Sequence, residues 1–279
     1  MFFKFPSFYF DISRNSCTFA AGKNRHKIMI YFFVQARVGS SRLPNKILLP
    51  FYNGKNILEL LIEKLQQVEN TGVIIATSTN PNCDPIEAIA QKKGAICFRG
   101  SEDDVLQRFI DAAEKNQVNQ LIRVCSDNPF LDLHGLRELV QFVYTSEQPI
   151  DYASFRINDT PSILTHYGFW TEYTTLAALL KAKEYAAGDH YYHEHLTSYL
   201  YTHPENFHIH WLSVPEVILT HPDIRLTIDT EDDFHTAQAI YKDICATNPY
   251  PTLNELIIYL DQHQDMYKMM KLQIEKNSK

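Results

Sequence analysis

Residues 35–46, Gln-Ala-Arg-Val-Gly-Ser-Ser-Arg-Leu-Pro-Asn-Lys, carry the strongest structural signal in this chain. They directly follow an apolar run at 28–34 that predicts a buried strand. A loop that leaves a strand through a Gly-Ser-Ser turn presents clustered backbone N–H groups, which suit phosphate oxygens. The segment lacks the Gly-Lys-Ser/Thr ending of a P-loop. It therefore predicts a phosphate-binding loop of another kind at the end of a strand.

Three cationic side chains stand in this loop, Arg37, Arg42 and Lys46. Together they can balance most of the charge of a triphosphate. Gly39 lets the backbone approach a ligand closely, and Pro44 stiffens the exit of the loop. A basic surface loop without a ligand is the alternative, but the full pattern Arg-x-Gly-Ser-x-Arg-x-Pro-x-Lys behind a strand favours a nucleotide site.

Four segments of the sequence resemble the cytidylyltransferases. They are the loop itself, Ala-Thr-Ser-Thr-Asn at 76–80, Arg-Gly-Ser-Glu-Asp-Asp-Val-Leu at 99–106 and Ser-Asp-Asn-Pro at 126–129. The closest resemblance is to the group of spore-coat polysaccharide biosynthesis protein F, relatives of CMP-KDO synthetase, and it extends from residue 30 to residue 241. It implies the nucleotide-diphospho-sugar transferase fold, which is GT-A-like and Rossmannoid, and the activation of a sugar by CTP.

The composition is that of an ordinary globular enzyme, with 45% hydrophobic and 21% charged residues in a chain of 279. This length can bury a large core in one enlarged domain. The net charge of −7 argues against a nucleic-acid partner, because binding to a phosphate backbone needs a basic face. The cations of the loop are a local exception, which favours a small anionic ligand.

Cysteine usage and hydropathy predict a cytoplasmic protein without a membrane span. The five cysteines are scattered without a Cys-x-x-Cys pair, a pattern typical of reduced thiols. No apolar run reaches the length of a membrane span. Residues 1–28 are rich in aromatic side chains but have no cleavage site of a signal peptide. We expect them to be an extension outside the fold, with a membrane-surface role as the weaker alternative.

Hydrophobic periodicity predicts alternating strands and helices in the first half of the chain. Helices are expected at 57–68, 84–92, 102–115 and 132–144, and strands at 72–77, 95–98 and 121–125. Ser101 and Asp104 suggest a capping box at the start of the third of these helices. Such alternation predicts an α/β fold with a mostly parallel central sheet and helices on both faces.

The rhythm changes in the second half of the chain. Strands are expected at 151–155, 169–173, 207–212 and 224–228, and helices at 175–186, 193–201, 232–245 and 253–263. No repeat and no Gly/Ser linker interrupts the sequence. We therefore expect a single domain over 29–265, with a nucleotide-binding half at 29–148, a sugar-binding and dimerisation half at 149–265, and a frayed tail at 266–279.

Two aspartates, Asp127 and Asp229, follow predicted strands, and ligands of open α/β sheets bind at such carboxyl ends. Asp127 could instead only form a turn, and Asp229 could belong to a helix start capped by Thr230 and Asp233. The resemblance places both aspartates at positions that ligate Mg²⁺. Two carboxylates also suit the preference of Mg²⁺ for few protein ligands plus phosphate oxygens.

The resemblance implies a reaction in which a sugar hydroxyl or phosphate attacks the α-phosphorus of CTP and pyrophosphate leaves. The predicted catalytic residues are Arg37, Lys46, Asp127 and Asp229. The predicted nucleotide-binding residues are Ala36, Arg37, Gly39, Ser40, Arg42, Lys46, Thr77, Ser78, Arg99 and Ser101. The predicted acceptor-binding residues are Asn128, Glu172, His195 and Arg225, of which Glu172 and Arg225 could equally be core or rim. A homodimer is implied by the relatives alone.

Asn45 departs from the resembling family, which usually has glycine at this position. Asn is among the residues that accept a left-handed backbone, so the loop is expected to keep its shape. Ser126 also replaces a common glycine, and this change affects the expected sugar rather than catalysis.

Other interpretations compete with this one. The run His190, His193 and His195 could suggest a separate metal site, but its spacing does not place all three on one helical face. Substrate or dimer contacts are the preferred interpretation. A GT-A glycosyltransferase is the alternative enzyme, although Asp127 lacks the second aspartate of the usual Asp-x-Asp motif. A nucleotide sensor without catalysis is the third possibility.

Overall fold

The computed structural model describes residues 29–276. The predicted extension at 1–28 and the residues 277–279 lie outside this range. The strands are β1 (Ile30–Gln35), β2 (Pro50–Tyr52), β3 (Lys55–Asn56), β4 (Thr71–Ser78), β5 (Ile96–Gly100), β6 (Gln120–Cys125), β7 (Tyr152–Ile157), β8 (Thr160–Pro161), β9 (Glu172–Thr175) and β10 (Ile209–Ser213). The helices are α1 (Ile57–Leu65), α2 (Asp84–Lys92), α3 (Val105–Lys115), α4 (Leu133–Thr145), α5 (Leu176–Ala186), α6 (His190–Glu194), α7 (Ser198–Thr202), α8 (Glu216–Leu219), α9 (Glu231–Ile244), α10 (Leu253–Gln262) and α11 (Gln264–Lys276).

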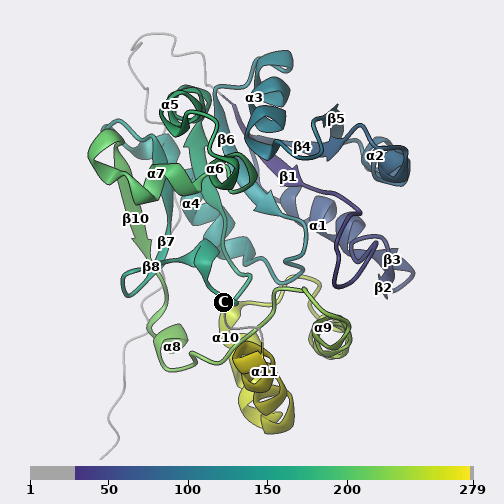
Figure 1. The fold of residues 1–279 in the computed structure, drawn as a ribbon. Coiled ribbons are helices and arrows are strands. Elements are labelled where there is room, and N and C mark those ends of the chain that lie inside the picture. Colours follow the sequence, from purple (N-terminus) through teal and green to yellow (C-terminus); the bar gives the residue numbers. More distant parts are fainter. Residues whose placement is uncertain (1–28, 277–279) are drawn as a thin grey trace, which may run out of the picture.

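An eight-stranded sheet forms the centre of the molecule (Figure 1), in the order β10-β7-β9-β6-β1-β4-β5 with β8 beside β7. β1 pairs in parallel with β4 and β6, and β4 with β5. β9 runs antiparallel to both β6 and β7, so it joins the strands of the two halves of the chain into one sheet. The predicted mostly parallel sheet is thus confirmed, and β9 and the short β8 are its antiparallel members.

The buried side chains of β1 alternate between the two faces of the sheet, which explains why helices cover both faces. Ile30, Phe32 and Val34 belong to one buried cluster, whereas Phe33 belongs to another. Because successive side chains of a strand point to opposite faces, a strand that is apolar throughout must be covered on both. The first cluster includes residues of α1, α4, α9 and α10, and the second includes residues of α3, α5 and α7. Figure 1 shows α3 and α5 away from α9 and α10 across the sheet.

The carboxyl ends of β1 and β6 lie side by side, because the register pairs Gln35 with Cys125. The loop of residues 36–46 leaves β1 at this edge, and the segment with Asp127 leaves β6. The parallel topology therefore brings together the two segments that the sequence singled out.

The predicted strand at 224–228 is wrong. This segment has no regular secondary structure, and its backbone bonds to two irregular segments and not to a neighbouring strand. Leu226 N donates to the carbonyl of His166 at 2.9 Å, and Ile228 N donates to the carbonyl of Asp127 at 3.0 Å. The segment thereby ties the two sides of the site together.

Three other predictions need correction. The predicted helix at 193–201 is two short helices, α6 and α7, separated at His195. α3 begins at Val105 with Asp104 as its N-cap, since the Asp104 carboxylate accepts from Gln107 N at 2.7 Å. Ser101 does not open this helix, although its hydroxyl accepts from Asp104 N at 3.0 Å.

The expected tail at 266–279 is helical as far as residue 276. α11 is helical over Gln264–Lys276, and its Met270 is buried to 2% exposure against the core. The burial of Met270 explains why this segment is helical, since helices gain most of their stability from packing. No helix within residues 29–276 is long and apolar enough to cross a membrane.

Candidate active site

The loop after β1 is a compact turn held by its own backbone. The carbonyl of Val38 accepts hydrogen bonds from Ser40 N at 2.9 Å and from Asn45 N at 3.2 Å. Asn45 has a φ of 58°, a left-handed conformation that a β-branched residue could not adopt without strain. The replacement of glycine by asparagine is therefore compatible with the turn. Val38 and Ile47 are buried and anchor its two ends.

Lys46 lies between the two predicted metal ligands. Its ammonium is 3.0 Å from Asp127 Oδ2 and 3.9 Å from Asp229 Oδ1, and it also donates to the carbonyl of Ile228. The Lys46 side chain is only 12% exposed. The structure thus brings Asp127 and Asp229 to one point, although they are far apart in the sequence.

The ion pairs of the two arginines of the loop are more exposed to solvent than those of Lys46. Arg42 donates to Asp229 at 2.8 Å, and Arg37 reaches Glu194 at 3.5 Å. Arg37 and Glu194 are 39% and 41% exposed, and exposed ion pairs of this kind contribute only about 0–1 kcal/mol. Such pairs can be exchanged for a phosphate at little cost.

Lys64 of α1 holds the backbone of the segment that follows Asp127. The buried Lys64 ammonium donates to the carbonyls of Pro129 and Leu131, both at 2.9 Å. Burial lowers the pKa of Lys64 to about 8. The described residues show no carboxylate within ion-pair distance of Lys64, so these two carbonyls hold its charge.

Asp229 is oriented by a buried Arg225–Asp233 pair. Arg225 donates to Asp229 Oδ2 at 3.0 Å and to both carboxylate oxygens of Asp233. Asp233 in turn accepts from the backbone N–H of Asp229 and Thr230, which completes the predicted capping box at the start of α9. Burial opposes the ionisation of Asp233, but Arg225 outweighs it and lowers the pKa of Asp233.

The donor set at this point fits a divalent cation that is shared with substrate. Within residues 29–276, no group of three or more His, Cys, Asp or Glu residues could hold a metal ion by itself. Asp127 and Asp229 nevertheless converge on one cation, the Lys46 ammonium. Two carboxylates completed by water and phosphate oxygens are a normal set for Mg²⁺.

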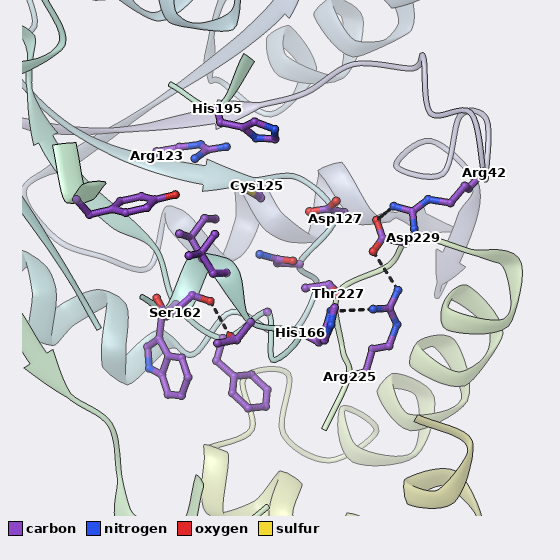
Figure 2. Close-up of a pocket in the computed structure, with 18 of the residues that line it drawn as sticks. Arg42, Arg123, Cys125, Asp127, Ser162, His166, His195, Arg225, Thr227 and Asp229 are labelled. Atoms are coloured by element: carbon purple, nitrogen blue, oxygen red, sulfur yellow. Dashed lines mark hydrogen bonds and ion pairs between the residues drawn. The ribbon is translucent and has the colours of Figure 1, made fainter. Parts of the chain in front are cut away.

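Two pockets meet at these residues, and Figure 2 shows the residues that line the larger one. The smaller has a volume of about 340 Å³, and it is lined by the loop from Arg37 to Lys46 together with Gln35, Ser126 and Glu194. The larger has a volume of about 590 Å³ and extends under residues 162–170. Six residues line both: Arg42, Arg123, Cys125, Asp127, His195 and Asp229.

The larger pocket has an aromatic and hydroxyl-rich wall. Phe169 and Trp170 line it, and the ring of Trp170 stacks on Phe155 behind it at 5.6 Å. Gly168 has a φ of 70°, and a Cβ there would lie 3.2 Å from Asn128 Oδ1. Asn128 Oδ1 is buried with no partner among the described residues, although Asn128 lines the pocket. Such a wall suits a sugar ring with its hydroxyl groups.

Several predicted nucleotide-binding residues lie away from both pockets. Arg99 donates to the carbonyls of Ser78 and Asn80 and pairs with Asp84 and Glu87 of the α2 region. The Ser78 hydroxyl lies 3.3 Å from Cys83 Sγ. Arg99 therefore joins β5 to the start of α2 in this structure.

The remaining residues of that set are placed as follows. Thr77 is fully buried, and its hydroxyl has no partner among the described residues. Ser101 is exposed before α3, and Ala36 is buried, with its N–H donating to the carbonyl of Ala76. None of these three lines either pocket.

Three of the four predicted acceptor-binding residues line the larger pocket, and the fourth does not. Asn128, His195 and Arg225 line the larger pocket. Glu172 is fully buried behind it and accepts from Arg123, Tyr152 and Thr197. Arg225 is 1% exposed by its side chain, so its main contacts are with Asp229 and Asp233.

Residues of α6 connect the site to α3. His193 Nδ1 lies 2.6 Å from Asp104 Oδ2, and Glu194 pairs with Arg37. His195 follows directly and lines both pockets. Of the histidines that the sequence singled out, His195 thus lies at the two pockets, and His193 contacts Asp104 at the start of α3.

Sequence reasoning missed Arg123 and Cys125 at the end of β6, and Tyr201, His166 and Thr227 around the larger pocket. Arg123 could have been found, because a charged residue within an otherwise apolar strand is rarely buried without a partner. Burial raises the pKa of the Cys125 thiol to about 11, so Cys125 is a neutral thiol near pH 7. The other residues carry no local signal.

Comparisons with known proteins agree with this geometry. Residues 31–276 match the family model described as cytidylyltransferase. The chain is 32% identical over 241 residues to the spore coat polysaccharide biosynthesis protein SpsF of Bacillus subtilis (strain 168), which covers 85% of this chain and 95% of that protein.

Solved structures show the same fold. A cytidylyltransferase from Leptospira borgpetersenii serovar Hardjo-bovis (strain JB197) is 27% identical with a TM-score of 0.72, over 86% of this chain and 96% of that one. CMP:2-keto-3-deoxy-manno-octonic acid synthetase in complex with CTP is 16% identical with a TM-score of 0.57, over 76% of this chain and 98% of that one. The chain therefore belongs to the cytidylyltransferase family, as an SpsF-type, CTP-dependent nucleotidyltransferase with the nucleotide-diphospho-sugar transferase fold.

Proposed function

We propose that this protein transfers CMP from CTP to a sugar acceptor, an acidic sugar or a sugar phosphate, and releases pyrophosphate. The observation that carries the proposal is the convergence of Asp127 and Asp229 on the Lys46 ammonium, where the two pockets meet. The name of the relative SpsF supports a role in the synthesis of a surface polysaccharide or glycan.

The smaller pocket is the proposed site of the triphosphate. Arg37, Arg42 and Lys46 line it, and in the free protein each is neutralised by a carboxylate. When CTP binds, its β- and γ-phosphates would replace these carboxylates as partners of the cations. Positioning and charge neutralisation are the main needs of phosphoryl-type transfer, so these residues would also stabilise the departing pyrophosphate.

Asp127 and Asp229 are the proposed ligands of Mg²⁺, together with phosphate oxygens of CTP. When bound there, the metal ion would polarise the α-phosphate and lower the pKa of an attacking hydroxyl. The chain itself contributes the orientation of the ligands: Arg225 and Asp233 hold Asp229, and Lys64 holds the segment that follows Asp127.

The larger pocket is the proposed acceptor site, with Asn128, His195 and the aromatic wall as contacts. An acceptor oxygen would form a bond to the α-phosphorus while the bond from this phosphorus to the bridging oxygen of the β-phosphate breaks. The electron pair of that bond leaves with pyrophosphate, and a hydroxyl acceptor releases its proton to solvent.

We further propose that the protein acts in the cytoplasm as a homodimer, with residues 29–148 as the nucleotide-binding half and residues 149–265 as the sugar-binding and dimerisation half. All four cysteines of the described residues, Cys83, Cys97, Cys125 and Cys245, are free thiols, which supports a reducing compartment. Sedimentation of the purified protein tests the dimer.

A pyrophosphate-release assay tests the reaction. The assay contains MgCl₂, one of the four NTPs at a time and a panel of acidic sugars and sugar phosphates. We expect pyrophosphate with CTP and one acceptor, because the metal ligands and the cationic loop are both present. Release with a different NTP would contradict the choice of CTP, and CTP binding without release across the panel would favour the sensor.

A further inference from the structure

The transferred phosphorus must lie where the two pockets meet, since it is bonded to the nucleotide and attacked by the acceptor. Residues that line both pockets are the best placed to contact it from both sides. Two of the six shared residues are cations, Arg42 and Arg123. In Figure 2, Arg123 and His195 lie on the side of the pocket opposite to Arg42 and Asp229.

These two cations differ in how firmly they are held. Arg42 is 46% exposed by its side chain, and its partner is Asp229, a predicted metal ligand. A metal ion on Asp229 would displace it. Arg123 is 8% exposed, and its carboxylate partner Glu172 is fully buried and outside both pockets. Arg123 is therefore the cation of the junction whose position does not depend on metal or nucleotide.

The hydrogen bonds of Arg123 leave one donor unused. Nε and Nη2 donate to Gln35 Oε1 at 3.2 and 3.1 Å, and Nη1 donates to Glu172 Oε2 at 3.0 Å and to Thr197 Oγ1 at 2.8 Å. An arginine has five N–H donors, and these bonds use four of them. Among residues 29–276, no hydrogen bond to the second N–H of Nη2 is present. The side chain that carries this donor lines both pockets.

The network behind Arg123 is more elaborate than packing requires. Glu172 lies opposite Arg123 in the β6–β9 register, and it accepts from Tyr152 at 2.6 Å and from Thr197 at 3.0 Å. Buried ion pairs are often no more stabilising than apolar residues of the same volume. Here the Arg123 guanidinium is held at the junction by contacts from four segments of the chain. They are Gln35 of β1, Glu172 of β9, Thr197 before α7 and, through Glu172, Tyr152 of β7. Preorganised donors of this kind stabilise charge that develops during a reaction.

We propose that Arg123 is a catalytic residue that donates its remaining N–H to a non-bridging oxygen of the α-phosphate of CTP, with Glu172 and Gln35 as its positioning residues. This inference rests on the proposed CMP transfer. Arg123 forms no covalent bond and gives up no proton in the step. It stays hydrogen-bonded to the same phosphoryl group while the bond to the acceptor forms and the bond to pyrophosphate breaks.

The experiment is a set of calorimetric titrations of cytidine, CMP, CDP and CTP in excess MgCl₂, which need no acceptor. We expect Arg123→Met to weaken CMP, CDP and CTP by the same factor, about tenfold, and to leave cytidine unchanged. Arg37→Met, in contrast, should weaken CTP and CDP but not CMP, because Arg37 is assigned to the outer phosphates. The matched control is Arg156→Met, an exposed arginine of β7 outside both pockets.

Two further variants keep the test decisive. If Arg123→Met does not fold, as judged from its thermal melt, Arg123→Lys retains the charge but not the fork, and it should weaken CMP less than Arg123→Met is expected to. Glu172→Gln should weaken CMP relative to cytidine, which a merely structural role would not do. CMP affinities of Arg123→Lys and Glu172→Gln within twofold of the wild type would overturn the inference. Failure of the wild type to bind CTP would instead overturn the proposed function.

Discussion

The Lys46 ammonium lies 3.0 Å from the Asp127 carboxylate, although 81 positions separate the two residues in the sequence. Lys46 ends the loop after β1, and Asp127 follows the neighbouring strand β6. In the free protein a cation of the chain thus occupies the place between Asp127 and Asp229 where a metal ion is proposed. We expect the nucleotide and the metal ion to bind together. The phosphates of the nucleotide would pair with Lys46, and the metal ion would pair with the carboxylates that Lys46 releases.

Asp127→Ala is expected to abolish turnover and to weaken CTP binding only moderately. The carboxylate contributes to metal binding at the reacting phosphate, whereas the triphosphate retains Arg37 and Arg42. Pyrophosphate release and calorimetry with CTP measure the two effects separately. Glu231→Gln, at an exposed carboxylate of α9, is the control, and wild-type activity of Asp127→Ala would mean that Asp127 is not a metal ligand.

Lys46→Ala is expected to weaken CTP binding by about tenfold to a hundredfold, since a hydrogen-bonded charge contributes about 1.5–3 kcal/mol. The effect should be larger for CTP than for CMP, because Lys46 is assigned to the outer phosphates. Titrations of both nucleotides measure it. Lys46→Arg provides the comparison that keeps the charge, and an unchanged CTP affinity of Lys46→Ala would refute the phosphate-binding role of the loop.

Asp233→Asn is expected to lower both stability and the apparent affinity for Mg²⁺. Breaking a buried ion pair typically costs about 3–5 kcal/mol, and Arg225 would lose its main partner while Asp229 loses its orientation. Urea unfolding and the dependence of turnover on MgCl₂ concentration measure the two effects. If the affinity for Mg²⁺ stayed at the wild-type value, Asp233 would have a structural role alone.

The same carboxylate predicts a pH dependence. The pKa of Asp233 is lowered in the folded protein from its ordinary value of 3.8, so the folded state binds fewer protons than the unfolded chain below that pH. Its contribution to the free energy of unfolding is therefore complete above pH 3.8 and is lost as pH falls through the folded pKa. The stability difference between the wild type and Asp233→Asn should shrink as pH is lowered below 3.8, and a constant difference would contradict this assignment.

Lys64→Met is expected to remove the part of the pH dependence of stability that Lys64 causes in the alkaline range. Burial lowers the pKa of Lys64 from 10.5 to about 8, so the folded state binds fewer protons than the unfolded chain between these values. Relative to Lys64→Met, the free energy of unfolding of the wild type should rise with pH in this window, by at most about 1.4 kcal/mol per pH unit. Urea unfolding of both proteins at pH 7.5, 9 and 10 measures the difference, which should stay flat if Lys64 is not buried as a cation.

The sequence predicted the elements of the first half well because their signals are local. β1, α1 and β4 follow from apolar periodicity, and the cap of α9 by Thr230 follows from three neighbouring residues. The segment 224–228 looked like a strand for the same local reason. Its partners, the carbonyls of His166 and Asp127, come from distant segments that no local pattern reveals.

The family and the loop chemistry were determined by the sequence itself, since the residues of 35–46 and 126–129 are contiguous and carry their charges in a recognisable order. Tertiary structure alone decided which cation pairs with which carboxylate. Arg225 lines the larger pocket, but its ion pairs are with Asp229 and Asp233, and Glu172 lies behind that pocket and pairs with Arg123. The partners of long polar side chains depend on which groups are buried together and on which strands are neighbours. Both are properties of the whole fold.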